Sequence, residues 1–554
     1  MRPRAAAVWA GLAPLLALFL AYLAWLGPGA AFGRYHDDTL YLSAAKAIAE
    51  GQGQVLPSVP GQPAQTKYPP LYSWLLSVVW RLAPPFPASI GWGVWMTAAF
   101  SCWFLVSSWR LLAGLKGVGG GPALAAVALC AFHPNFLYLS GALLSDVPFL
   151  ALAMAAALAA DAALRQEGRP QAALAAGLWA GLAVLTRGFG VAVVAGIVAT
   201  ALLRRAWRQG ALFLALAAPL ALAGLWNQTA PAPPGPLPGF QQTWLYYTSY
   251  SGFWKASVPG VEVLAAMLQA NLRLLLEAPA TLCLFPPLGE PGSFLAGLLT
   301  VTLSAGILSG VVRQARRQQW KPIHFVLVFY AGIVALWNYP LVDRFLVLFL
   351  PLLYAGLWVE ARHFASLLAG VWRWRRPLAD RVIAAAMAAG LAAVGVAAVE
   401  RYARGDRSQL RKMALTGAAL AAEKQQLYDW VRRNTSPRDR FIAYQDVELY
   451  LHTGRQAMRP MAFSTAAFFT RQEKYLEQDL DRLLDTARVI GARYWVKSAN
   501  DFQLETGLPL ILRRVGELEA TLPEVFRTTG GRLRVYELAL APSHTTPDIS
   551  TLIP

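Results

Sequence analysis

The chain has 554 residues, of which 56% are hydrophobic and only 14% are charged. Soluble globular proteins average about 25% charged residues, so this composition excludes a single soluble globule. A mean hydropathy of +0.41 likewise excludes a disordered or collagen-like chain. The three cysteines, Cys102, Cys130 and Cys283, lie in apolar stretches and predict no disulfide framework.

The net charge of +18 is distributed unevenly along the chain. Residues 1–399 hold 26 Lys and Arg but only 12 Asp and Glu, whereas residues 400–554 hold 23 and 19. A basic excess often indicates a nucleic-acid partner. Here the basic residues form short clusters between apolar runs, which is the positive-inside pattern of a multi-pass membrane protein. We therefore expect contact with membrane lipid and no nucleic-acid partner.

Eleven apolar segments predict membrane-spanning helices, which need about 17–25 residues each. They lie near residues 7–26, 89–109, 121–141, 147–164, 171–186, 188–203, 210–226, 293–312, 323–339, 345–360 and 382–399. With these spans, the six basic clusters that flank them all fall on one side of the membrane. The N-terminus is therefore predicted to be cytoplasmic.

One further segment decides the direction of every later span. The run Pro70–Ala83 has 14 residues and, counted as a span, would place the later basic clusters outside. This length is short for a span and fits an interfacial or re-entrant segment better. We therefore expect the C-terminal region to lie on the external side.

The predicted organisation is a membrane region, residues 1–399, followed by an external domain, residues 400–554. Loops at 27–88 and 227–290 are expected on the same external side. The C-terminal domain has a normal soluble composition and reads as a small α/β domain. Its predicted elements are helices at 414–434 and 473–490, strands at 440–444 and 493–497, and a hairpin of 525–528 with 533–538.

Two adjacent carboxylates, Asp37 and Asp38, follow the first span. Residues 39–50 have the apolar spacing of a helix, which Asp38 could cap through the free N–H groups. Asp37 would then lie beside the helix start and could point into a cleft. The alternative interpretation is that both are ordinary acidic residues of a first helical turn.

A third carboxylate, Asp146, lies where the third span ends and the fourth begins, on the same predicted side. Ser145 and Asp146 before Pro148 also fit an ordinary helix cap. Cations flanked by apolar sequence occur at this level, and an ionisable group at membrane depth suggests a function. The alternatives are interfacial snorkelling and, for Arg344, a pair with Asp343. These cations are Arg34, Lys67, Arg187 and Arg344.

Carboxylates and cations near the headgroups suit a substrate with a phosphate at the interface and a lipid tail in the bilayer. Arg and Lys would bind the phosphate, and a carboxylate would deprotonate an incoming hydroxyl or amine. The six histidines show no metal-ligand spacing, and no nucleotide-binding or hydrolase motif is present.

The order of these residues resembles the GT-C class of lipid-linked-sugar glycosyltransferases. The closest resemblance is to the protein O-mannosyltransferase and aminoarabinose transferase superfamily, which carries an Asp-Glu pair after its first span. Here Asp37 matches the Asp and Asp38 replaces the Glu. The superfamily's Lys-Pro-Pro-Leu-Tyr motif matches from Lys67, with Tyr68 inserted. Its later acidic and basic motifs match at Asp146, Arg187 and Arg344.

The resemblance implies a GT-C type helix bundle of about 11–13 spans with an appended periplasmic α/β domain in a bacterial inner membrane. It implies a polyprenyl-phosphate-linked sugar donor, inversion at the anomeric carbon, and a protein, lipid or glycan acceptor. Asp37 would be the general base, with Asp146 and Asp38 as further catalytic carboxylates. Lys67, Arg187, Arg344 and Arg34 would bind the donor phosphate.

Neither the motifs nor the resemblance requires a cofactor, although related enzymes bind a divalent metal through such carboxylates. Two functions of other classes stay open. One is a transporter or flippase for lipid-linked glycans, which would need charges along the spans. The other is a catalytically inactive membrane protein that binds glycans.

Overall fold

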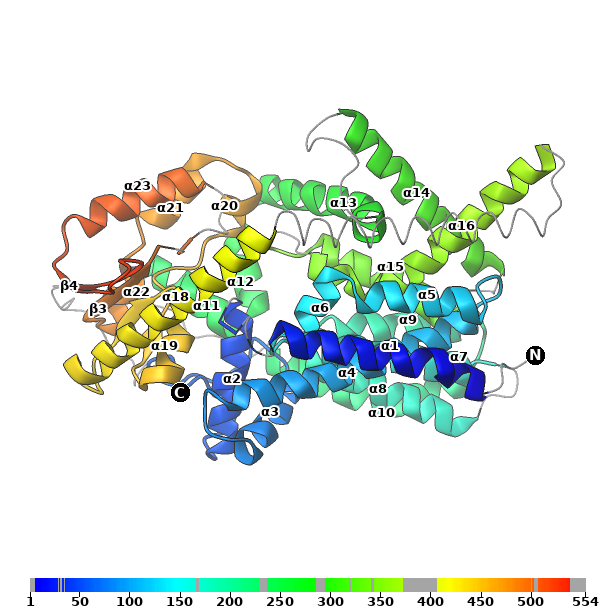
Figure 1. Ribbon diagram of the computed structural model, residues 1–554, viewed down its shortest axis with the longest axis horizontal. Coiled ribbons are helices and arrows are strands. Elements are labelled where there is room, and N and C mark those ends of the chain that lie inside the picture. Colours follow the sequence, from blue (N-terminus) through cyan, green and yellow to red (C-terminus); the bar gives the residue numbers. More distant parts are fainter. Residues whose placement is uncertain are drawn as a thin grey trace.

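The computed structural model is an elongated helix bundle with a smaller domain at one end (Figure 1). It describes residues 5–27, 29, 32–33, 35–165, 169–228, 237–284, 294–317, 320–339, 343–371, 406–499, 501–502 and 507–538. We call the end that carries the C-terminal domain the domain end and the opposite one the basic end. The predicted span at 382–399 and the predicted boundary at residue 399 lie outside the described residues.

The bundle is built from helices at the first ten predicted spans. These are α1 (Ala5–Leu26), α4 (Ser89–Ala113), the bent pair α5 (Gly120–Ala131) and α6 (Pro134–Ser140), α7 (Asp146–Ala163), α8 (Pro170–Thr186), α9 (Gly190–Leu203), α10 (Trp207–Gln228), α14 (Phe294–Arg317), α15 (Pro322–Ala335) and α16 (Leu350–Val371). A 3₁₀ turn, η1 (Asp343–Phe349), leads into α16.

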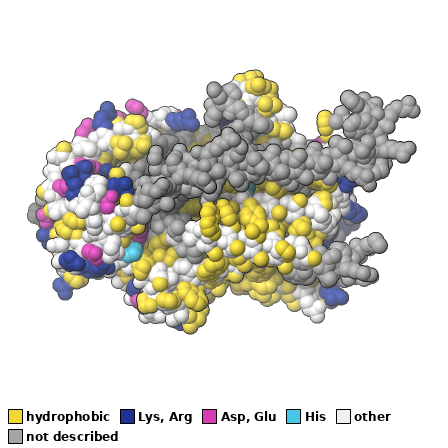
Figure 2. Space-filling view, viewed as in Figure 1, with side chains coloured by type: hydrophobic (Ala, Val, Ile, Leu, Met, Phe, Trp, Pro, Cys, Tyr) yellow, Lys and Arg dark blue, Asp and Glu magenta, His cyan; other side chains and the backbone are white. Residues whose placement is uncertain are grey.

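Five of the described helices are long and apolar enough to cross a membrane unbroken, or seven if each bent pair counts as one span. This number is below the expected 11–13 partly because α8, α9 and α15 have only 17, 14 and 14 residues. A 14-residue helix extends about 21 Å, less than the hydrocarbon core of about 30 Å. Hydrophobic side chains nevertheless cover the visible flank of the bundle (Figure 2), and the chain is a multi-pass membrane protein.

Contacts between loops bring the ends of several helices together at the basic end. Lys321, before α15, pairs with Asp161 of α7 at 3.0 Å and donates to the carbonyl of Gly114 after α4. Arg204, after α9, donates to the carbonyl of Trp320. Helices that follow one another in the chain therefore run in opposite directions through the bundle. The predicted basic clusters at their ends lie at the same end of the bundle.

Two short helices near the N-terminus stay at the domain end. They are α2 (His36–Ala49) and α3 (Leu71–Leu82), and Arg81 of α3 donates to the carbonyls of Ile48 and Ala49. At 12 residues α3 would extend about 18 Å, too little to cross the hydrocarbon core. The interfacial interpretation of Pro70–Ala83 therefore agrees with the length and contacts of α3.

The segment expected as the second external loop contains three helices. They are α11 (Pro238–Thr248), α12 (Tyr250–Ser257) and α13 (Val261–Leu284), with a bend of 114° between α12 and α13. Helix α13 lies within a segment where no helix was expected from the sequence. It packs against α14, where the N–H of Ala280 donates to Ser304 Oγ at 3.0 Å.

The C-terminal domain is the predicted small α/β unit. Its sheet has the strand order β2-β1-β3-β5-β4, with β1 parallel to both β2 and β3 and the β5 pairs antiparallel. The strands are β1 (Phe441–Ala443), β2 (Ala457–Met458), β3 (Tyr494–Ser498), β4 (Glu524–Arg527) and β5 (Leu533–Glu537), and the helices are α18 (Asp406–Asn434), α19 (Asp446–Thr453), α20 (Thr465–Phe469), α21 (Glu473–Leu480), α22 (Asp485–Ile490) and α23 (Leu508–Glu519).

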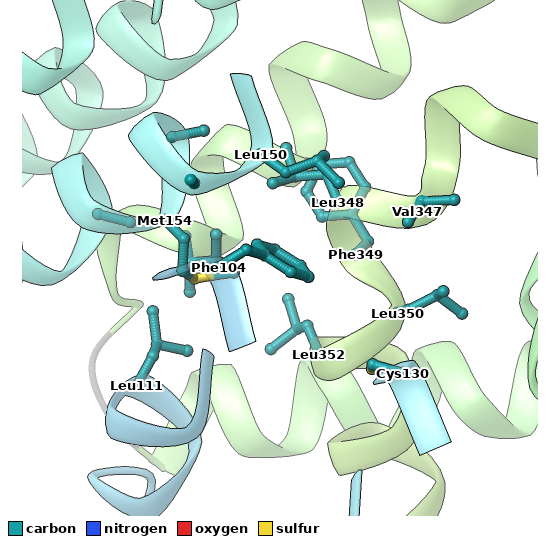
Figure 3. Packing of buried hydrophobic residues seen from close by; sticks show 14 of the residues in the cluster. Phe104, Leu111, Cys130, Leu150, Met154, Val347, Leu348, Phe349, Leu350 and Leu352 are labelled. Atoms are coloured by element: carbon teal, nitrogen blue, oxygen red, sulfur yellow. The ribbon is translucent and has the colours of Figure 1, made fainter. Parts of the chain in front are cut away.

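Two large apolar cores hold the molecule together. The first fills the bundle, where Phe104 and Met154 pack against Phe349 and Leu352 (Figure 3). The second joins α2 and α11 to the C-terminal domain through residues such as Trp244. Because this second core contains residues of both parts, the domain is packed onto the bundle by buried apolar surface.

A close approach between α14 and α16 depends on two glycines. A Cβ added to Gly310 of α14 would clash with the carbonyl of Gly356 in α16, and one added to Gly356 would lie 2.6 Å from the carbonyl of Ile307. Small residues allow such close backbone contact between membrane helices.

Gly310→Leu should therefore force α14 and α16 apart and lower the midpoint of thermal unfolding. Overpacking of this kind costs about 1–3 kcal/mol. The matched control is Gly306→Leu on the same helix, because nothing lies within 4 Å of a Cβ there. Equal midpoints for the two variants in detergent would contradict this packing.

Candidate active site

Asp37 lies in the first turn of α2, at the domain end of the bundle. The helix begins at His36, three residues earlier than predicted. The Asp37 Oδ1 atom accepts a hydrogen bond from the Tyr68 hydroxyl at 2.6 Å, and Oδ2 accepts one from Arg344 Nη2 at 2.9 Å. Arg344 forms an ion pair with Asp37, whereas the side chain of Asp343, the alternative partner, lies outside the described residues.

The charge of Asp37 is stabilised by its neighbours. Burial alone would raise the pKa of this carboxyl, but Arg344 and Lys67, together with the Tyr68 hydrogen bond, hold the pKa well below its usual range. Asp37 is therefore ionised at neutral pH and still has lone pairs free beyond its two hydrogen bonds.

Asp38 does not share this environment. It is fully buried, and its Oδ2 accepts a hydrogen bond from the backbone N–H of Gly33 at 3.1 Å. The prediction that Asp38 caps the helix is wrong, because Tyr35 occupies the cap position. Burial and the nearby charge of Glu448 raise the pKa of Asp38. Adjacent residues on a helix point in different directions, which explains why the two carboxylates have different partners.

Asp146 forms a second ion pair beside the first. It is the first residue of α7, and its Oδ2 lies 2.5 Å from Nη1 of Arg187, which follows α8. As the capping alternative predicts, Ser145 occupies the cap position of α7, but no side-chain cap hydrogen bond is present. The Arg187 and Arg344 guanidinium groups both lie against the ring of Phe345, at 5.3 and 5.1 Å.

Lys67 is buried against aromatic rings. Only 2% of the residue is exposed, and Nζ lies 3.6 Å from the ring centroid of Tyr246. The snorkelling interpretation is wrong for this residue, since its charge is not in bulk solvent. Burial lowers the pKa of Lys67 to about 7, against the opposing effect of Asp37.

The structure thus brings together five of the seven candidate residues from α2, the loop before α3, α7, the end of α8 and η1. They are Asp37, Lys67, Asp146, Arg187 and Arg344. Asp38 points elsewhere, and Arg34 lies outside the described residues. The cluster contains three basic and two acidic side chains, so it is suited to bind an anion next to a carboxylate.

Several residues of the site were missed from the sequence. Tyr68, the residue inserted in the family motif, binds Asp37 directly. His36, adjacent to Asp37, bonds Asp446 of the C-terminal domain through Nε2 at 2.9 Å, and its Nδ1 lies 3.1 Å from the Tyr246 hydroxyl. The contacts of His36 join residues 210 and 410 positions apart, and contacts at such separations leave no local pattern in the sequence.

A divalent metal does not fit this arrangement of side chains. The Asp37 oxygens accept from Tyr68 and Arg344, and Asp146 pairs with Arg187. Among the described residues, no three His, Cys, Asp or Glu side chains form a group that could hold an ion.

The sequence profile of the dolichyl-phosphate-mannose-protein mannosyltransferase family matches residues 67–226, which include Lys67, Asp146 and Arg187. A search of curated protein sequences finds no match.

Two solved structures align over nearly the whole chain. One is ArnT from Cupriavidus metallidurans bound to undecaprenyl phosphate, with a TM-score of 0.51, 14% identity, and coverage of 96% of this chain and 98% of ArnT. The other is the apo oligosaccharyltransferase of Archaeoglobus fulgidus, with a TM-score of 0.52, 14% identity, and coverage of 97% and 74%. The chain therefore has the fold of the GT-C class glycosyltransferases.

The His36–Asp446 contact predicts a dependence of stability on pH. Burial, with a contribution from Arg459, lowers the pKa of His36 to about 4. The unfolded chain, with a His pKa near 6.5, binds more protons between about pH 6.5 and pH 4. Acidification through this range should therefore destabilise the folded protein.

His36→Gln should remove this part of the pH dependence, because Gln can still donate to Asp446 but does not titrate. The measurement is the thermal midpoint of both proteins from pH 7 to pH 4. Parallel curves for wild type and variant would show that His36 is not the responsible group.

Proposed function

We propose that this protein is an inverting glycosyltransferase that moves a sugar from a polyprenyl-phosphate-linked donor to an acceptor at the domain end of the bundle. The observation that carries this proposal is the partly exposed Asp37 carboxylate held between Tyr68 and Arg344, beside Lys67, in a GT-C fold. The undecaprenyl phosphate bound to the similar ArnT structure supports a lipid phosphate as part of the substrate.

In the proposed reaction, an acceptor hydroxyl or amine attacks the anomeric carbon of the sugar. The bond between that carbon and the phosphate oxygen breaks, and its electron pair leaves with polyprenyl phosphate. The acceptor proton goes to Asp37. Lys67 and Arg344, with Arg187 behind them, stabilise the charge that develops on the phosphate. Asp146 holds Arg187 in place and lies where it could orient a sugar.

The low pKa of Asp37 bears on the timing of this proton transfer. A weakly basic carboxylate accepts a proton only when the acceptor atom has begun to bond to carbon and has become acidic. A donor phosphate between Arg344 and Lys67 would also share their charge and so raise the pKa of Asp37. Donor binding would thus prepare the base for the acceptor.

We further propose that the membrane is a bacterial inner membrane, with the basic end cytoplasmic and the C-terminal domain periplasmic. The basic clusters at one end of the bundle support this orientation. A protein, a lipid and another glycan are the acceptor classes to test, and the sugar is to be identified with a panel of donors.

The Asp37→Asn variant should lose at least about a hundredfold of its transfer rate, because the amide cannot take the proton. The measurement is release of polyprenyl phosphate by purified protein from a panel of polyprenyl-phosphate sugars, with membrane extract as acceptor. Asp481→Asn, at an exposed carboxylate of the C-terminal domain, is the control.

Release at the wild-type rate by Asp37→Asn would eliminate Asp37 as the base. Tight binding of a lipid-linked glycan by the wild type, without release from any donor, would instead favour the transporter or the inactive glycan-binding protein.

The orientation is tested by cysteine labelling in spheroplasts with a membrane-impermeant maleimide. Arg438→Cys, an exposed position of the C-terminal domain, should be labelled in unlysed spheroplasts. Lys116→Cys, exposed at the basic end, should be labelled only after lysis. The opposite result would invert the topology.

A further inference from the structure

Arg459 of the C-terminal domain reaches the candidate active site without a partner for its charge. It follows β2 directly, and its backbone N–H donates to the Tyr247 hydroxyl at 2.9 Å. Its guanidinium lies over the rings of Tyr444 and Tyr246, at 4.3 and 5.6 Å. Among the described residues, no carboxylate lies within ion-pair distance of it, and its buried Nε has no hydrogen-bond partner.

Asp446, a carboxylate whose charge acts on Arg459, has its hydrogen bonds to other residues. One of its oxygens bonds His36 Nε2 at 2.9 Å, and the other accepts from the Tyr247 hydroxyl at 2.6 Å. His36 stays neutral at pH 7, because burial holds its pKa near 4. Asp446 therefore forms no ion pair with Arg459, and its charge acts on Arg459 only over a longer distance.

Lys67 adds a second cation at the same ring. Its Nζ and the Arg459 guanidinium both lie over Tyr246, although one comes from the loop before α3 and the other from the C-terminal domain. The charge of Arg459 contributes to lowering the pKa of Lys67. Two mutually repelling cations held at one ring cost free energy that a bound anion would offset.

Guanidinium donors that have no hydrogen-bond acceptor also support a site for an anion. Buried Nε and Nη1 of Arg344 have no hydrogen-bond partner, like Nε of Arg459. A buried guanidinium donor without an acceptor is unfavourable in the free protein and is satisfied by an anionic oxygen. Phosphate, with several such oxygens, matches donors that converge from three separate segments of the chain.

We propose that Arg459 and Lys67 together bind a phosphate group of the substrate, so that the C-terminal domain supplies a binding residue to the transfer site. This inference rests on the proposed function and adds a residue that the sequence did not indicate. The phosphate has two candidate sources, the lipid-linked donor and a phosphorylated acceptor, which share the same chemistry.

The test measures binding directly, with the full-length protein in nanodiscs and no transfer reaction. Undecaprenyl phosphate and the soluble methyl phosphate are the two probes. Arg459→Gln should weaken binding of at least one probe by about tenfold or more, because a charge-assisted hydrogen bond is lost. Arg514→Gln, at an exposed arginine of the same domain, is the matched control and should bind like wild type.

The two probes distinguish the sources. Weaker binding of undecaprenyl phosphate assigns Arg459 to the lipid-linked donor. Weaker binding of methyl phosphate alone assigns Arg459 to a phosphate on the acceptor. Unchanged binding of both probes by Arg459→Gln overturns the inference.

Two further measurements separate this result from misfolding and from failure of the proposed function. Thermal midpoints test folding, and Arg459→Lys, which keeps the charge, should restore part of the binding. If no sugar is transferred but phosphate binding still depends on Arg459, the transferase proposal fails and the binding site stands. If Arg459→Gln transfers sugar with wild-type kcat and KM for donor and acceptor, the inference fails and the transferase stands.

Discussion

Buried charge is the constraint on which the domain end of this protein depends. Ionised groups removed from water are costly unless a partner of opposite charge is held close to them. Asp37 with Arg344 and Asp146 with Arg187 meet this condition by pairing residues from four separate segments. One pair therefore joins α2 to η1, the other joins α7 to the end of α8, and the same charges form the candidate site.

The C-terminal domain is part of this arrangement and is not an independent module beside the bundle. Asp446 bonds His36, the residue before Asp37, and Asp485 accepts from the backbone N–H of Gly239 at the start of α11. Apolar residues of both parts form one core between these polar contacts. In Figure 1, α2 and α11 accordingly lie between the bundle and the domain. A shift of the domain would be transmitted directly to the helix that carries Asp37.

The aromatic residues between the two parts explain how so many charges remain close together. Tyr246 lies against Lys67, Arg459 and His36, and Phe345 lies against both Arg187 and Arg344. An aromatic face attracts a cation without neutralising it. The cations are therefore held in place while their charge stays available to a substrate anion. This property suits a site that must bind a phosphate and then release it.

The sequence by itself determined the class of fold, because apolar runs and basic clusters indicate membrane spans within short stretches of the chain. It also indicated Asp37, Lys67, Asp146, Arg187 and Arg344, since charges are conspicuous in apolar surroundings. It predicted the hairpin at Gly530 and Gly531 from local turn chemistry. Only the tertiary structure decided which charges meet. It pairs Arg344 with Asp37, places Asp38 away from the site, and places His36 and Arg459 toward it. These contacts join residues hundreds of positions apart, so their energy depends on packing that no local pattern encodes.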